Sequence, residues 1–105
     1  MTDFMKLMQQ AQQMQAGLQQ VQADLGNRTV TGTAGGGMVT AEADGRGTVR
    51  RVTIDPKVVD PSDVAMLEDL VAVAVADAQQ KAASLQESEM GKVAGGMNLP
   101  FDLPL

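Results

Sequence analysis

The sequence predicts an α+β fold in which a long helix, a three-stranded antiparallel sheet and a second long helix follow one another. Three observations predict it: apolar residues recur at helical spacing before residue 26 and again after residue 63, and the segment between is rich in Thr, Val and Gly. The first two patterns are typical of amphipathic helices, and the third of strands joined by turns. A length of 105 residues fits one domain. We expect this domain to span residues 1–90, followed by an irregular tail with Gly and Pro at 91–105.

The first predicted helix runs from Asp3 to Leu25, contains no Pro, and ends at Gly26-Asn27. Eight Gln residues occupy much of the remaining surface, and they either solvate an exposed face or contact a partner surface such as a phosphate backbone. The apolar positions alternate in steps of three and four, which is the 3.5-residue period of a coiled coil. They are Phe4, Leu7, Ala11, Met14, Leu18, Val21 and Leu25.

Three strands are expected next, at residues 28–33, 38–43 and 48–54. The Asp44-Gly45 pair between the last two is a strong hairpin signal. In the third strand, Val52 and Ile54 share a face that Val49 does not, so we expect a β-bulge near Arg50-Arg51.

The second predicted helix runs from about Asp63 to Glu89, with Asp60 or Ser62 as its cap. Its middle is apolar on nearly all sides, and such a helix must be covered on all sides. One short sheet and one other helix cannot supply that cover, which favours a homodimer with an isologous interface. The residues expected at that interface are Val39, Val52, Leu67, Leu70, Val71 and Ala74.

The composition excludes most chemistry. The chain has no Cys and no His, so disulfides, thiolate nucleophiles, Cys-ligated zinc and the commonest general base are absent. Gly35-Gly36-Gly37 is not followed by the Gly-Lys-Ser or Gly-Lys-Thr of a phosphate loop. We therefore predict no enzymatic activity, catalytic residue, metal, cofactor or small-molecule substrate. The longest apolar run, Val71 to Ala76, is too short to span a membrane, which favours a cytoplasmic protein without a membrane partner.

Charge is unevenly distributed along the chain. The net charge is −5, but basic residues gather in the predicted sheet, where Arg50-Arg51 is the one adjacent basic pair of the sequence. A stacking surface for nucleic-acid bases is not expected, because Trp and Tyr are absent and Phe occurs twice. Any contact with nucleic acid must therefore depend on backbone electrostatics and shape.

Five segments in this order carry a resemblance to a known family. They are residues 8–15 (MQQAQQMQ), 30–39 (VTGTAGGGMV), 50–56 (RRVTIDP), 66–71 (MLEDLV) and 96–100 (GMNLP). With these segments the chain resembles the YbaB/EbfC family of bacterial nucleoid-associated proteins over nearly its whole length. The resemblance implies a tweezer-like homodimer in the nucleoid that binds double-stranded DNA with little sequence preference and contributes to nucleoid organisation or gene regulation.

The resemblance also implies that the ends of the two long helices are arms that contact DNA. Family members commonly carry several Lys or Arg there, whereas this sequence has mostly Gln, so we expect weak binding that falls steeply as salt rises. The alternative hypothesis is a protein-protein interaction module that uses the Gln-rich heptad helix, with weak or no DNA binding. The residues expected to contact DNA phosphates are Lys6, Arg28, Arg50, Arg51, Lys81 and Lys92.

Overall fold

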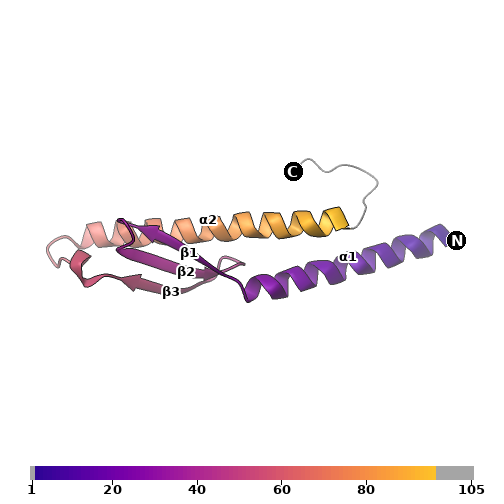
Figure 1. The fold of residues 1–105 in the computed structure, drawn as a ribbon, viewed down its shortest axis with the longest axis horizontal. Helices are drawn as coiled ribbons and strands as arrows, with labels where there is room; N and C mark the ends of the chain where they lie inside the picture. The colour runs from indigo at the N-terminus through magenta and orange to yellow at the C-terminus, as the bar shows by residue number, and fades with distance from the viewer. Residues whose placement is uncertain (1, 97–105) are drawn as a thin grey trace.

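The computed structural model describes residues 2–96 and has the predicted α+β order (Figure 1). Its elements are α1 (Thr2–Gly26), β1 (Thr29–Ala34), β2 (Val39–Asp44), β3 (Val49–Ile54), the short 3₁₀ helix η1 (Pro56–Val58) and α2 (Val64–Gly96). α2 continues past Glu89, where the sequence predicts its end, and includes Gly91 and Gly95. The rest of the predicted irregular tail, residues 97–105, lies outside the described residues.

The sheet has the order β1-β2-β3 with antiparallel pairing throughout. Between β2 and β3 the register shifts, because Glu42 pairs with Arg51 and Ala43 pairs with Val49, which leaves Arg50 as the extra residue. The predicted β-bulge is therefore confirmed. Its consequence is that the apolar residues of β3, at 49, 52 and 54, all lie opposite buried residues of β2 and share the α2 side of the sheet.

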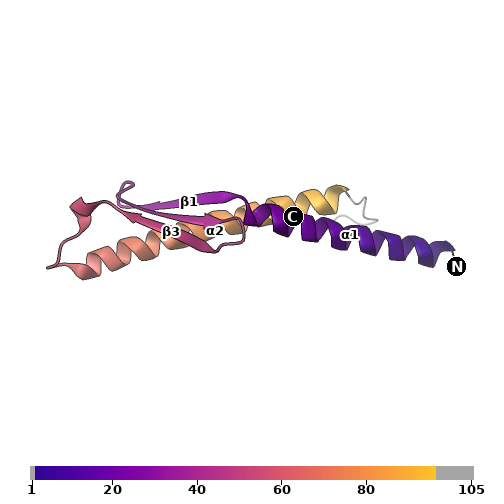
Figure 2. The same cartoon turned by 90° about the horizontal axis from the view of Figure 1, so that it is seen from below.

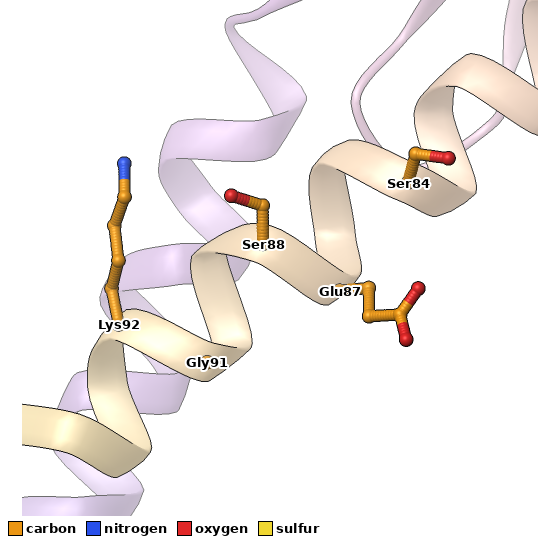
Figure 3. Close-up of a pocket in the computed structure, with 5 residues that line it drawn as sticks. All are labelled: Ser84, Glu87, Ser88, Gly91 and Lys92. Atoms are coloured by element: carbon orange, nitrogen blue, oxygen red, sulfur yellow. The ribbon is translucent and has the colours of Figure 1, made fainter. Parts of the chain in front are cut away.

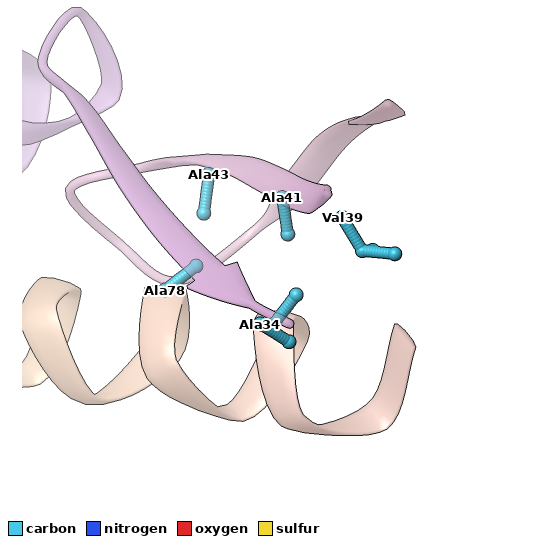
Figure 4. Close-up of a cluster of buried hydrophobic side chains, with 6 residues drawn as sticks. Ala34, Val39, Ala41, Ala43 and Ala78 are labelled. Carbon is cyan, nitrogen blue, oxygen red and sulfur yellow. The ribbon is translucent and has the colours of Figure 1, made fainter. Parts of the chain in front are cut away.

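α2 covers that side of the sheet through small residues (Figure 4). A Cβ atom placed on Gly32 of β1 would lie 2.2 Å from the carbonyl oxygen of Ala74, so the helix and the strand approach as closely as their backbones allow. α2 packs mainly on β1 and β2 and little on β3, and Val52 therefore stays 38% exposed. The buried cluster between the layers comprises Ala34, Val39, Ala41, Ala43, Ala74 and Ala78.

Glycines form the turn between β1 and β2, and aspartate side chains shape the turn before α2. Gly35, Gly36 and Gly37 have φ angles of 62°, 66° and 90°, a left-handed backbone that other residues rarely adopt. Before α2, the carboxylate of Asp63 accepts a hydrogen bond of 3.2 Å from the amide of Met66. Asp63 is therefore the cap of α2, and the predicted cap, Asp60 or Ser62, is wrong. Those two residues bond each other in the preceding turn, because the side chain of Asp60 accepts from the amide and hydroxyl of Ser62.

α1 leaves the sheet and runs beside the second half of α2, so that the molecule is elongated, 72 × 24 × 16 Å (Figures 1 and 2). The two helices meet where a Cβ on Gly17 would lie 3.3 Å from the Val93 side chain. At the root of α1, Val21 and Leu25 are buried, whereas its first three turns are exposed. The fold is thus a two-layer body from which α1 projects as an arm.

Candidate nucleic-acid interface

Two of the six cations predicted to contact DNA share one acidic partner. The Arg28 guanidinium lies 3.8 Å from the Glu89 carboxylate, and the Lys92 ammonium lies 3.1 Å from it, one turn further along α2. Both basic side chains remain more than half exposed. Exposed pairs of this kind are worth about 0–1 kcal/mol, so a phosphate competes with Glu89 for them at little cost.

Arg50 is held more firmly, at the root of the arm. Its guanidinium lies 3.1 Å from the carboxylate of Asp44 and donates a hydrogen bond of 2.9 Å to the carbonyl of Gly26, the last residue of α1. Arg46 donates in the same way to the carbonyl of Gln22. Gly26 is among the last four residues of α1, whose carbonyls have no partner within the helix, and both cations complement the dipole at this helix C-terminus. These two arginines therefore fix α1 to the β2–β3 hairpin.

Asp44 is the acid on which this arrangement centres. Its side chain is buried, and burial opposes its ionisation, but hydrogen bonds from the amides of Thr48 and Arg46 and the charge of Arg50 outweigh that effect and hold the pKa of Asp44 below its ordinary value. The carboxylate is thus a charged anchor of the hairpin turn.

Lys81 is bound at the outer edge of β1. Its ammonium lies 3.1 Å from the carboxylate of Asp77 and donates a hydrogen bond of 2.9 Å to the carbonyl of Thr31. The same carboxylate accepts from the amide of Thr33 at 3.0 Å, and this bond together with Lys81 lowers the pKa of Asp77. The pair satisfies backbone groups that an edge strand otherwise leaves open.

Lys6 and Arg51 are the two predicted contacts without an ion pair among residues 2–96. Lys6 lies on the exposed part of the arm, and Arg51 lies on the face of the sheet opposite α2, since its neighbour across the sheet is Glu42. Lys57 of η1 is a third exposed cation that has no ion pair among the described residues. Sequence reasoning missed Lys57, because a lysine after a proline reads as an ordinary turn residue. The three lie on three different elements, α1, β3 and η1.

The arm presents amide groups rather than charge to solvent. Its glutamines are all exposed, and among the described residues one bonds another side chain, through the Gln20 amide and Asp24 at 3.1 Å. Each Gln offers two N–H donors. The arm can therefore bond phosphate oxygens without bringing a large net charge. The glutamines are Gln9, Gln10, Gln12, Gln13, Gln15, Gln19, Gln20 and Gln22.

A shallow depression lies on the distal half of α2 (Figure 3). Ser84, Ser88 and Lys92 recur at intervals of one turn along the helix, which brings two hydroxyls and an ammonium to one side, with Glu87 and Gly91 completing the lining. Hydroxyl and ammonium groups are the usual donors to a nucleic-acid backbone. The depression is open and does not enclose a small molecule.

Comparison with known proteins decides the family. The family model described as the YbaB/EbfC DNA-binding family matches residues 1–97. The chain belongs to the YbaB/EbfC DNA-binding family. It is 47% identical over 102 residues to a nucleoid-associated protein of Gemmatimonas aurantiaca, a match that covers 97% of this chain and 98% of the relative. It is also 46% identical over 105 residues to one of Granulibacter bethesdensis, covering 100% of this chain and 98% of that protein.

A third relative agrees with these two. The nucleoid-associated protein of Chloroflexus aurantiacus is 50% identical over 92 residues, which cover 88% of this chain and 92% of the relative. The prediction that the chain is a member of a DNA-binding family rather than an enzyme is therefore confirmed. Within residues 2–96 of this YbaB/EbfC protein, acidic side chains do not gather into a group able to hold a metal ion, and no helix has the length and apolarity needed to cross a bilayer.

The six residues predicted at the dimer interface of this YbaB/EbfC protein differ in how far they are buried within the single chain. Val39 and Ala74 are completely buried within the single chain, so they are core residues of the subunit, and their prediction as contacts with a partner is corrected. Val52 is partly exposed on β3, and Leu67, Leu70 and Val71 of α2 are half-buried beside the sheet. We name these four partly exposed apolar residues the body patch.

Proposed function

We propose that this YbaB/EbfC protein is a homodimeric nucleoid-associated protein that binds duplex DNA through the phosphate backbone with little sequence preference, and so contributes to nucleoid organisation or gene regulation. Family membership carries the proposal. The surface chemistry supports its finer parts, because donors to phosphate are plentiful. Base-stacking aromatics are scarce, since the chain has no Trp and no Tyr.

The two edges of the sheet differ in whether other residues cover them, and this difference supports the dimer. Asp77 and Lys81 cover the outer edge of β1, whereas none of the described loops or side chains hydrogen-bonds the outer edge of β3. Val52 of the body patch lies on this open strand and is 38% exposed. An uncovered strand edge next to apolar residues is a surface that another chain can pair with. We expect two subunits to bury their body patches and β3 edges against each other around a two-fold axis.

The DNA contact is expected to combine few charges with many neutral donors. Lys6, Arg51 and Lys57 are without an ion pair in the described part of the chain, and Arg28 and Lys92 are weakly held by Glu89. If the first three of each subunit neutralise phosphates, the slope of log affinity against log salt is about −5 for the dimer, since each phosphate contributes about −0.9.

Fluorescence anisotropy with two duplexes of unrelated sequence tests the DNA part. We expect affinities that agree within about threefold at low salt and a salt slope between about −5 and about −9, the steeper value if Arg28 and Lys92 also bind phosphates. Absence of binding up to high micromolar dimer at low salt contradicts the proposal. A preference of more than about a hundredfold for one duplex contradicts backbone recognition, because it requires base contacts worth about 2.7 kcal/mol.

A further inference from the structure

The apolar heptad positions of α1 form one continuous stripe with two different environments. We name Phe4, Leu7, Ala11, Met14, Leu18, Val21 and Leu25 the arm stripe. At its root, Val21 and Leu25 are buried against the body. At its tip, Phe4 is 65% and Leu7 is 62% exposed. The same side of the helix is thus covered at one end and open at the other.

α2 does not reach the tip of the arm stripe. The two helices meet at Gly17 and Val93, close to the last described residue of α2, and in both views α1 extends well beyond that point (Figures 1 and 2). Every residue from Asp3 to Gln13 is exposed. Large apolar side chains gathered on an exposed surface indicate a contact site.

The spacing of the stripe identifies the kind of partner. A straight helix drifts by about 20° per heptad from a strict 3.5-residue repeat, so a sequence that keeps this repeat favours packing against another helix in a left-handed supercoil. The repeat is unbroken from Phe4 to Leu25, which includes the part of α1 already packed beside α2. A DNA groove or a bilayer does not impose a 3.5-residue repeat, whereas continuity with an existing helix–helix contact points to a helix.

Charge identifies that helix as another copy of α1. The charged residues of α1 are Asp3, Lys6 and Asp24, and none belongs to the arm stripe. Between Leu7 and Val21 the flanking heptad positions are the uncharged Met8, Gln10, Gln15 and Gly17, so two identical helices can approach there without like-charge repulsion. A bilayer surface is a poorer match, since interfacial helices carry several Lys or Arg on their polar face and α1 carries Lys6 against two acids.

We propose that the tip of the arm stripe pairs with the arm stripe of another copy of this chain, through a surface separate from the body patch. The pairing deepens the proposed function and rests on it in one respect: dimers joined through their body patches would be linked to further dimers through their arms. The glutamines on the opposite side of each arm stay free to face a duplex. The arms would then connect DNA-bound dimers, which is the action expected of a protein that compacts a nucleoid.

Sedimentation velocity without DNA tests the proposal. The wild-type protein is expected to form species larger than a dimer as its concentration rises, toward about 44 kDa, four times the chain mass of 11.0 kDa. Leu7→Glu places a charge on the stripe and should hold the protein at the dimer. Met5→Glu is the matched control, because Met5 is 67% exposed but lies about 160° around the helix from Leu7; it should assemble like wild type.

Cysteine cross-linking gives an independent readout, since the chain has no Cys of its own. Leu7→Cys should form a disulfide-linked pair under mild oxidation, and Met5→Cys should not. Circular dichroism checks that each variant is folded. A wild-type protein that stays a dimer at every concentration and whose Leu7→Glu variant is a dimer as well, or Glu variants at both positions with the same assembly, overturns the proposal.

The remaining outcomes separate this inference from the proposed function. A Leu7→Glu protein that becomes a monomer supports arm pairing and contradicts the body-patch dimer. Assembly that persists while anisotropy detects no DNA binding supports arm pairing and contradicts the DNA proposal. Larger species that form solely when duplex is added place DNA, not a second arm, on the stripe and overturn the inference.

Discussion

Arg50 and Arg51 are neighbours in β3, yet Arg50 is bound within the subunit and Arg51 is not. The β-bulge makes Arg50 the unpaired residue of the strand, and its side chain reaches Asp44 and the end of α1. Arg51 pairs with Glu42 in the sheet and points to the face opposite α2. Two adjacent cations that look equivalent in the sequence therefore have different roles, one in fixing the arm and one available to a ligand.

This difference predicts opposite phenotypes for two matched substitutions. Arg50→Gln should lower Tm by about 5 °C, because losing about 1 kcal/mol of unfolding free energy shifts Tm by that amount in a domain of about 100 residues. Arg51→Gln should leave Tm unchanged, weaken DNA binding a few-fold, and make the salt slope of the dimer shallower by about 2, one phosphate per subunit. Thermal denaturation and anisotropy across a salt series measure both effects.

The roles assigned to Arg50 and Arg51 are contradicted if each variant shows the phenotype expected of the other. If Arg50→Gln reduces the salt slope while Tm is unchanged, its contacts with Asp44 and Gly26 are not maintained in solution. If neither variant changes the slope, the sheet face is not part of the DNA interface and the arms carry it alone.

The environment of Asp44 predicts how stability depends on pH. Because its pKa is lowered by folding, the unfolded chain binds the proton more tightly, and stability rises with pH through this range. The contribution is fully present above the ordinary value of 3.8 and is lost as pH falls through the lowered pKa of the folded state. Asp60 and Asp77 act in the same direction. With no His in the chain, stability should be nearly constant between about pH 5 and 8.

Acid unfolding followed by circular dichroism measures this dependence. Asp44→Asn keeps the shape of the side chain but cannot carry its charge, so the variant should be less stable at pH 7 and should lose less stability than wild type on acidification. An unchanged acid profile in this variant means that other carboxylates control the transition.

The sequence predicts the elements of this fold well because each has a local cause. Heptad spacing, the Asp44-Gly45 turn and the phase break around Val49 and Val52 predict the first helix, the hairpin and the bulge, and all three are present. The predicted cap of α2, Asp60 or Ser62, lies three positions or one position before the actual cap, Asp63, since all three are good capping residues. Only the turn geometry selects Asp63.

The candidate site is less accessible to sequence reasoning, because contacts between distant residues decide which cations are available. Lys81 binds the carbonyl of Thr31, fifty positions earlier, and Arg50 binds that of Gly26. The same limit explains the error at Val39 and Ala74. The apolar pattern of a sequence is the same whether the residues are buried in the core of their own subunit or against a partner. Val39 lies in the central strand, where α2 covers it completely.

The body patch predicts that dimerisation can be separated from folding. Val52→Asp puts a charge on a residue that is already 38% exposed in the subunit, so the variant should fold and sediment as a monomer of 11.0 kDa. Leu70→Asp should unfold the subunit as well, since Leu70 packs on the core beneath the Gly35 turn and an unpaired buried charge costs several kcal/mol. Light scattering and thermal melting measure the two properties. A dimeric Val52→Asp protein excludes the patch as the interface.

The contact between Gly32 and α2 predicts the most severe substitution. In Gly32→Ala the new methyl group would lie 2.2 Å from the Ala74 carbonyl and 2.3 Å from the Ala78 amide, so the helix must move off the sheet. Overpacking of a rigid contact costs about 1–3 kcal/mol or more, out of a total stability of about 5–15 kcal/mol. Gly36→Ala is the matched control, because it strains a left-handed turn but meets no atom within 4 Å, and it should cost about 1 kcal/mol. Urea denaturation of both variants measures the difference, and equal midpoints would mean that α2 does not lie this close to β1.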